Sequence, residues 1–108
     1  MEARDQLRNP DALEGALARP TNYAHYKGAD FAMQAAVLAS GIAETQPFIE
    51  GNKRVALAAM LTFIAINGFE LNATQAQLAD WIIRLSANLD DDGLASLIRG
   101  LLVASGSV

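Results

Sequence analysis

The sequence contains no cysteine, and it has no long uninterrupted apolar run. The first absence excludes a disulfide framework and thiolate metal sites. The longest apolar stretch, Val55 to Ile66, is interrupted by Thr62 and is shorter than the roughly 20 residues that cross a bilayer. The first ten residues, MEARDQLRNP, are charged and lack the apolar segment of a secretory signal. We therefore expect a cytoplasmic protein with no membrane association.

Basic residues are also scarce, with 8 lysines and arginines against 12 acidic residues and a net charge of −4. Extensive binding to nucleic acid needs many cations to neutralise phosphates, so we expect no nucleic-acid partner. Lys53 and Arg54 form the one adjacent basic pair that stands out. Hydrophobic residues make up 52% of the 108-residue chain and charged residues 19%. These proportions predict a packed core and a single domain over residues 1–108.

The first half of the chain contains residues that are typical of helix starts and helix ends. Asn9 followed by Pro10 is typical of a helix start, and Pro20 is expected to end that helix. Residues 21–29 have no helical period, which predicts a loop. Asp30 can cap a second helix, whose inner stripe consists of small or aliphatic residues: Ala32, Ala35, Ala36, Ala39 and Ile42.

Three further helices are predicted after a break at residues 46–51. The first begins near Asn52, is apolar nearly all round and ends at Asn67-Gly68, which is typical of a central helix packed on several sides. The second opens with Thr74 and Gln77, spaced as a capping box. The third begins near Asp90.

The fold predicted from these signals is all-α, a compact bundle of about five to six helices with a central apolar helix. No segment has the alternating pattern of a convincing strand. Residues 103–108 are expected to form a frayed tail.

The segment Gln46-Pro47-Phe48-Ile49-Glu50-Gly51-Asn52-Lys53-Arg54 carries the chemistry. Gly51 allows a sharp turn, and the first turn of the helix after it presents unpaired N–H donors that favour anions. Lys53 and Arg54 are unfavourable in a first turn unless an anion pairs with them. Glu50 can hold a magnesium ion that bridges phosphate oxygens. The segment is typical of a site for a magnesium-bound nucleotide, although a helix start with solvated charges has the same composition.

The same segment resembles the signature of the Fic/Doc (death-on-curing) family, His-x-Phe-x-(Asp/Glu)-(Gly/Ala)-Asn-(Gly/Lys)-Arg, from Pro47 to Arg54. Flanking stretches, from Leu13 to Pro20 and from Ala56 to Gly68, are similar to the family's early and central helices, so the likeness extends over residues 9–102. Lysine at position 53 and leucine at position 57 are similar to the Doc branch of toxins.

The resemblance implies a function and partners. A Doc-like toxin transfers a phosphoryl group from ATP, with Mg²⁺, to a hydroxyl of a translation factor such as elongation factor Tu, and an antitoxin neutralises it. Typical Fic relatives transfer an adenylyl group instead. The resemblance leaves the oligomeric state open.

Residue roles follow from the resemblance position by position. Phe48 is expected to be a buried anchor, and Glu50 the magnesium ligand. Gly51, Asn52 and Lys53 are expected to line the phosphate site with backbone and side-chain donors, and Arg54 to neutralise the transferring group. The family's flap for the target peptide falls at residues 21–29, where Tyr23, His25 and Tyr26 are candidates for target contact; an ordinary surface loop would look the same.

The chain departs from the family pattern at Gln46, which occupies the position of the catalytic histidine. A carboxamide can orient a hydroxyl but cannot take its proton near pH 7, and His25 is too remote in sequence to be expected to substitute. Two interpretations stand: a substitution that silences a toxic enzyme, and a natural pseudo-enzyme that keeps nucleotide or partner binding without turnover. A helical interaction protein without a nucleotide site is a third hypothesis.

Overall fold

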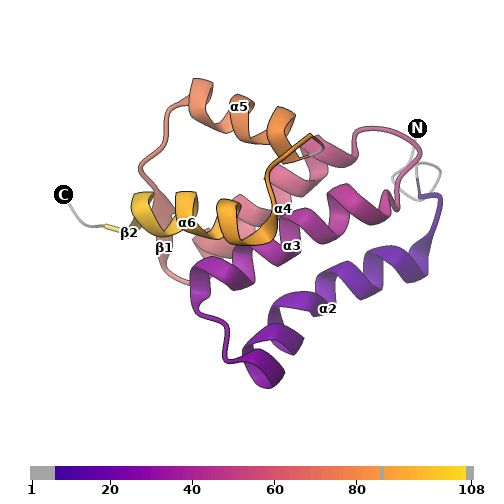
Figure 1. The fold of residues 1–108 in the computed structure, drawn as a ribbon, viewed down its shortest axis with the longest axis horizontal. Helices are drawn as coiled ribbons and strands as arrows, with labels where there is room; N and C mark the ends of the chain where they lie inside the picture. The colour runs from indigo at the N-terminus through magenta and orange to yellow at the C-terminus, as the bar shows by residue number, and fades with distance from the viewer. Residues whose placement is uncertain (1–6, 86, 107–108) are drawn as a thin grey trace.

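The computed structural model describes residues 7–85 and 87–106, which form helices and two short strands (Figure 1). The helices are α2 (Pro10–Lys27), α3 (Phe31–Thr45), α4 (Asn52–Ile66), α5 (Gln75–Leu85) and α6 (Asp91–Leu101), and the strands are β1 (Phe69–Leu71) and β2 (Leu102–Ala104). This composition confirms the predicted all-α class.

The predicted helix starts are confirmed by their capping hydrogen bonds. The side chains of Asn9, Asp30 and Asp90 accept from backbone N–H groups three residues later, at 3.1, 2.9 and 2.7 Å. Thr74 and Gln77 exchange side-chain to backbone bonds of 2.8 and 3.1 Å, which is the reciprocal pattern of a capping box. Local sequence chemistry therefore decides where these four helices begin.

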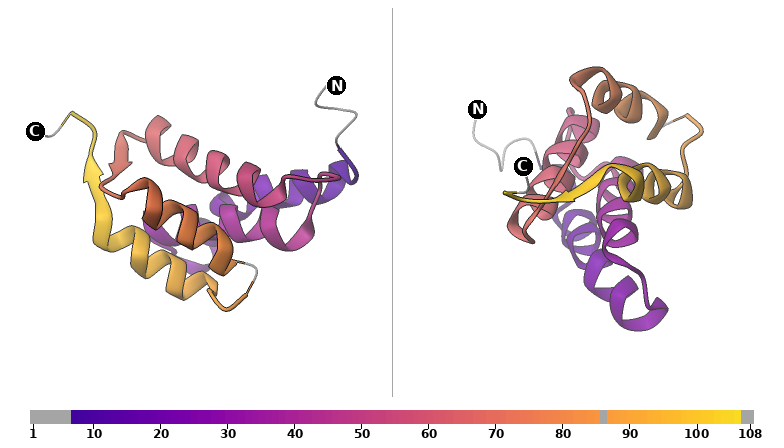
Figure 2. Two further views of the ribbon diagram at one scale, coloured as in Figure 1. Left: turned by 90° about the horizontal axis from the view of Figure 1, so that it is seen from above. Right: turned by 90° about the vertical axis from the view of Figure 1, so that its left-hand side faces the viewer.

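Helix α3 lies at the centre of the molecule, in contact with α2, α4 and α6 (Figure 2). Its buried residues are mostly small: Ala32, Ala35, Ala36, Val37, Leu38, Ala39, Ser40, Gly41 and Ile42. Small side chains allow a close approach of α2. A Cβ atom on Gly41 would lie 3.0 Å from Cδ of Arg19 and 3.2 Å from Cβ of Ala16. The predicted stripe of small residues is thus the packing surface of the central helix.

Helix α4 is less buried than its sequence predicts. It packs on α3, β1 and α5, and it buries only Ala56, Met60 and Ile64, whereas Ile66 is 76% exposed. A central apolar helix exists, but it is α3, and the prediction that Val55–Ile66 would be packed on several sides was wrong for the outer face. The apolar content of a helix shows that it can be buried. How much of its surface is buried depends on the elements that pack against it.

Helix α2 does not stop at Pro20, so the predicted loop over residues 21–29 is wrong for residues 21–27 and holds only for Gly28 and Ala29. The helix continues to Lys27 and ends at Gly28, whose left-handed conformation (φ 63°) suits glycine. Pro20 removes one helical hydrogen bond, but it is buried in the packed face of the helix together with Ala16. This packing offsets the local cost of the proline, and it cannot be inferred from the local sequence.

The two strands were not predicted. They pair antiparallel, with Phe69 opposite Ala104 and Leu71 opposite Leu102, at the end of the molecule opposite the start of α2 (Figure 2). Each strand has three residues, too few for an alternating pattern to register. Val103 and Ala104 therefore belong to β2 and not to a frayed tail. Residues 107–108 of the predicted tail lie outside the described residues.

Among the described residues, no helix combines the length and the apolarity that a membrane span requires.

Candidate active site

A pocket of about 320 Å³ opens where α3 ends and α4 begins. Its lining comes from the end of α3 and from the segment singled out in the sequence: Ala43, Gln46, Gly51, Asn52, Lys53 and Arg54. The structure thus brings together five of the predicted site residues around one hollow.

The start of α4 presents unpaired N–H groups to this pocket. Gly51 occupies the N-cap position in a left-handed conformation (φ 77°), and no side chain in the described chain caps the helix. The first helical bond runs from the Val55 N–H to the Gly51 carbonyl, at 2.9 Å. The preceding N–H groups are therefore free to bind an anion, and the helix dipole favours one there.

Lys53 and Arg54 add positive charge to the same turn. Both side chains are exposed, and both residues line the pocket. Two cations beside a bare helix N-terminus repel that end of the dipole, so an anion in the pocket would relieve an unfavourable arrangement. The geometry fits a phosphate-bearing ligand.

The side chain of Asn52 has a structural task. Its Oδ1 accepts from the Phe48 N–H at 2.9 Å, and its Nδ2 donates to the Phe48 carbonyl at 3.0 Å. These two bonds hold the turn that carries Gly51. One of the two Nδ2 donors of Asn52 is thus used within the turn, and its role toward phosphate stays a prediction.

An N-terminal arm fixes the other side of the turn. The backbone N–H groups of Arg8 and Asn9 donate to the Pro47 carbonyl at 2.6 and 2.9 Å, and Leu7 forms a bridge with Phe48. Pro47 is fully buried, whereas Phe48 is only half-buried. The buried anchor of the loop is therefore Pro47, and Phe48 contributes mainly through its backbone.

Gln46 is the one non-glycine residue with a positive φ (49°) among the described residues. Its N–H continues the helical pattern by donating to the Ile42 carbonyl at 3.1 Å. Its side chain borders the pocket. Because a carboxamide has no useful basicity, the pocket has no proton acceptor from this side chain.

Arg8 contacts Gln46, and the sequence analysis missed it. Its Nη2 lies 2.9 Å from the Gln46 carbonyl oxygen and 3.4 Å from the side-chain Oε1. The two residues are 38 positions apart in sequence, so no local pattern links them.

Glu50 is exposed and is not among the residues that line the pocket. No group of three or more acidic, histidine or cysteine residues in the described ranges could hold a metal by itself. Magnesium, however, is commonly bound by one or two carboxylates together with substrate phosphates. A lone carboxylate next to an anion-binding turn fits a metal that arrives with its nucleotide.

The proposed target-contact residues lie far from this pocket. Tyr23, His25 and Tyr26 are in the last turns of α2. Each helical residue advances the axis by about 1.5 Å, so His25 lies about 24 Å along α2 from Asn9, whose N–H donates to the carbonyl of Pro47, the residue after Gln46. The structure therefore does not bring these residues to the Gly51 turn, and residues 21–27 of the expected flap are helical.

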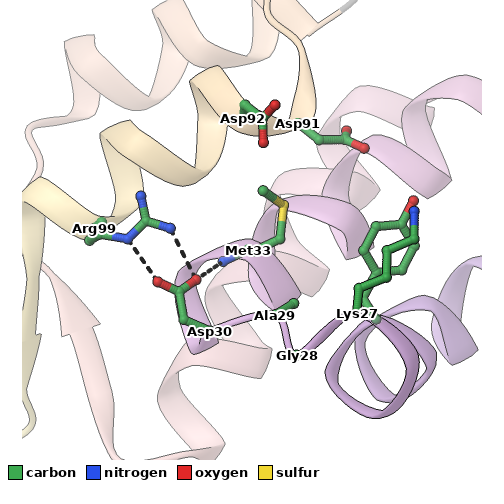
Figure 3. A pocket seen from close by; sticks show the side chains of 9 residues that line it. Lys27, Gly28, Ala29, Asp30, Met33, Asp91, Asp92 and Arg99 are labelled. Carbon is green, nitrogen blue, oxygen red and sulfur yellow. Dashed lines mark hydrogen bonds and ion pairs between the residues drawn. The ribbon is translucent and has the colours of Figure 1, made fainter.

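A second pocket, of about 570 Å³, lies at the opposite end of α3 (Figure 3). Asp30 and Arg99 form a two-point ion pair across it, with distances of 2.8 and 3.0 Å. The hydrogen bond from Arg99 and a second one from the Met33 N–H hold the pKa of Asp30 below its usual value. The Lys27 ammonium lies 4.6 Å from the centre of the Tyr23 ring. Arg99 is thus paired within the protein and Lys27 lies over an aromatic ring, whereas the carboxylates of Asp91 and Asp92, which also line this pocket, have no ion pair among the described residues.

Comparison with protein families shows which family the segment around the first pocket comes from. A model of the Fic/DOC family matches residues 2–64, which is more than half of the 108-residue chain. The chain belongs to the Fic/Doc family. The matched region contains the whole of the Gly51 turn. Members of this family are generally enzymes that transfer AMP or phosphate from a nucleotide triphosphate to proteins, typically with a metal. No curated protein and no solved structure matches the chain.

Proposed function

We propose that this chain is a Doc-like toxin scaffold that binds ATP with Mg²⁺ at the Gly51 turn and is crippled in turnover by Gln46. With histidine at position 46 it would transfer a phosphoryl group to a hydroxyl of a translation factor, with elongation factor Tu as the first candidate. The observation that carries the proposal is the shared pocket of Gln46, Gly51, Lys53 and Arg54 at an uncapped helix start.

The residues divide the work of phosphate binding. The free N–H groups of the first turn of α4 and the Lys53 ammonium would hold the nucleotide phosphates. Arg54 would neutralise charge on the transferring group, and such preorganised electrostatics contribute most to phosphoryl transfer. Glu50 would hold the magnesium ion, which neutralises phosphate charge when bound.

Proton transfer explains the loss of turnover. As the target oxygen bonds to phosphorus, the bond to the ADP leaving group breaks and the hydroxyl proton must go to a base. Gln46 cannot accept it, and the absence of a general base typically lowers the rate by about 10²–10⁴-fold. His25, about 24 Å away along α2, cannot replace it.

Phosphoryl transfer is favoured over adenylyl transfer by positions 53 and 57. Typical adenylyl-transferring relatives have glycine at the first position and arginine at the second. Here Lys53 offers an exposed ammonium, and Leu57 is a half-buried apolar residue within α4. The second position therefore cannot supply a cation to the pocket. Adenylyl transfer by the same pocket is the alternative.

The test restores the missing base. Gln46→His, incubated with ATP, magnesium and elongation factor Tu, should add one phosphate to the factor, as measured by intact-protein mass spectrometry. An added adenylate would establish the alternative reaction. Gln46→His/Arg54→Ala is the control for a folded protein with a damaged pocket. A folded Gln46→His protein that modifies neither this factor nor any protein in a lysate would refute the enzyme scaffold.

A nucleotide-binding pseudo-enzyme is the second candidate. It is supported by the contacts of Arg8 with Gln46, which hold the carboxamide in a defined place at the pocket. Under this proposal the unaltered chain binds magnesium-ATP in calorimetry, and Gln46→His still turns over nothing.

An antitoxin partner is part of the proposal. An apolar groove of about 490 Å³ runs between α2 and α4, and it includes Leu17 and Ile66, which are 54% and 76% exposed. Such a surface suits the apolar face of a partner helix. In cells that express the Gln46→His protein, co-expression of the antitoxin should restore growth. Adding Leu17→Lys to that protein should abolish the restoration, whereas adding Ile83→Lys, at an exposed position outside the groove, should not.

A further inference from the structure

Arg8 determines which end of the Gln46 carboxamide is available to a ligand. A guanidinium has donors only, so the Gln46 side-chain atom that faces it must be the amide oxygen. The Arg8 Nη2 is 3.4 Å from this Oε1, and its 2.9 Å bond to the Gln46 main-chain carbonyl holds the guanidinium in place. The side-chain orientation at position 46 is therefore imposed from the N-terminal arm.

The amide NH₂ of Gln46 is left without a hydrogen-bond partner among residues 7–85 and 87–106. Gln46 borders the same pocket as Lys53 and Arg54, and the first turn of α4 adds its uncapped N–H groups. Every other polar group that we assign to this rim is a donor.

We propose that Arg8 is a positioning residue that turns Gln46 into an additional N–H donor for a bound polyphosphate. The inference rests on the proposed assignment of this pocket to phosphate. It means that position 46 strengthens anion binding in this chain, whereas a histidine at the same place would serve proton transfer. The ligand class is a di- or triphosphate, recognised by its oxygen atoms.

The first test uses magnesium tripolyphosphate as the probe, with affinity measured by calorimetry. Gln46→Met keeps the length of the side chain and adds no charge but removes the NH₂ donor. We expect affinity to fall about 10- to 100-fold, the range for losing a hydrogen bond to a charged group. Gln34→Met is the matched control, because the Gln34 amide donates to the Ala29 carbonyl at the far end of α3, at 3.1 Å. Equal affinity of the Gln46→Met and unaltered proteins would overturn the inference.

The second test separates positioning from direct contact. Arg8→Gln should weaken tripolyphosphate binding several-fold in the unaltered background and have no further effect when combined with Gln46→Met. Arg8→Lys, which keeps a donor beside Oε1, should restore much of the affinity. An equal loss from Arg8→Gln in both backgrounds would show that Arg8 acts by itself and would overturn the positioning role.

A spectroscopic readout covers variants that fold poorly. In the unaltered protein, the side-chain NH₂ resonances of Gln46 should shift on addition of tripolyphosphate, and those of Gln34 should not. Absence of any shift at Gln46 at saturating probe would contradict the inference.

The outcomes distinguish the inference from the proposed function. Probe binding that depends on Gln46 and Arg8, together with an inactive Gln46→His protein, would support the inference and refute the enzyme. Phosphoryl transfer by the Gln46→His protein, together with tripolyphosphate binding that does not depend on Gln46 or Arg8, would support the enzyme and refute the inference. A failure of the unaltered chain to bind tripolyphosphate would refute the inference.

Discussion

The two ends of helix α3 have similar groups, but these groups are paired with one another to different extents. Each end borders a pocket that lies beside a helix N-terminus and contains basic side chains. At the Asp30 end, the carboxylate caps α3 and pairs with Arg99. At the Gln46 end, α4 has no side-chain cap, and neither Lys53 nor Arg54 has an ion-pair partner in the described parts of the chain.

This difference shows why the smaller pocket is the candidate site. At the Asp30 end, Arg99 is already neutralised by Asp30, and the remaining carboxylates of Asp91 and Asp92 would repel an anion. Unpaired donors and cations around a hollow are unfavourable by themselves, so they are best explained by a ligand that completes them. The two ends differ in the pairing of their arginines, and not only in pocket size: Arg99 is ion-paired, and Arg54 has no ion pair among the described residues.

The largest expected effect is on nucleotide binding. Arg54→Ala should lower the affinity for magnesium-ATP about 10- to 100-fold, the cost of a hydrogen bond to a charged group, as measured by calorimetry. The fold should be no less stable, because Arg54 has no ion pair within the described chain to lose. The matched change at the other end, Arg99→Ala, should leave ATP affinity unchanged. Comparable losses of affinity from both variants would remove the distinction between the two ends.

A smaller effect is expected on backbone conformation. Gly51 and Gly28 have left-handed φ values of 77° and 63°, so replacing either with alanine should cost about 1–2 kcal/mol of stability in urea unfolding. Space is not the cause, since a Cβ on Gly51 would meet only Arg54 Nη2 at 3.8 Å.

The two glycines should differ in ligand binding. Gly51→Ala should also weaken ATP binding, because the turn that presents the N–H groups is altered, whereas Gly28→Ala should not. Gly15→Ala serves as the control, since the glycine is within α2 and no atom outside its own stretch of helix lies within 4 Å of its added Cβ. A stabilised Gly51→Ala protein would show that the turn is not held in the left-handed conformation.

The smallest effect is expected at the Asp30 end. Asp30→Asn keeps the helix cap, because asparagine caps as well as aspartate, but it removes the charge that pairs with Arg99. Both side chains are about half exposed, so the melting temperature near neutral pH should fall by only about 1–5 °C.

The pH dependence follows from the sign of the shift. Hydrogen bonds from Arg99 and from the Met33 N–H lower the pKa of Asp30 in the folded state. Its stabilising contribution is therefore present above the ordinary value of 3.8 and is lost as pH falls through the lower folded value. Thermal melts at several pH values should show the gap between the unaltered protein and Asp30→Asn closing in acid. A gap that widens in acid would contradict the assignment.

Much of the fold could be predicted wherever the signal is local. Asn9, Asp30, Thr74 and Asp90 start helices through side-chain to backbone bonds within three residues, and sequence alone shows that spacing. The end of α2 could not be predicted in this way, because Pro20 is accommodated by burial in a tertiary interface. The two strands depend on pairing between residues about thirty positions apart.

In the candidate site, too, local features could be predicted from the sequence and long-range contacts could not. By itself, the sequence determined the all-α class, the helix starts and the contiguous segment from Gln46 to Arg54, since short-range chemistry controls each of them. Only the tertiary structure decided that Arg8 lies beside Gln46, that Glu50 lies outside the pocket lining and that His25 is at the remote end of α2. These relations depend on how α2 packs along α3, and residues distant in sequence meet only once that packing exists.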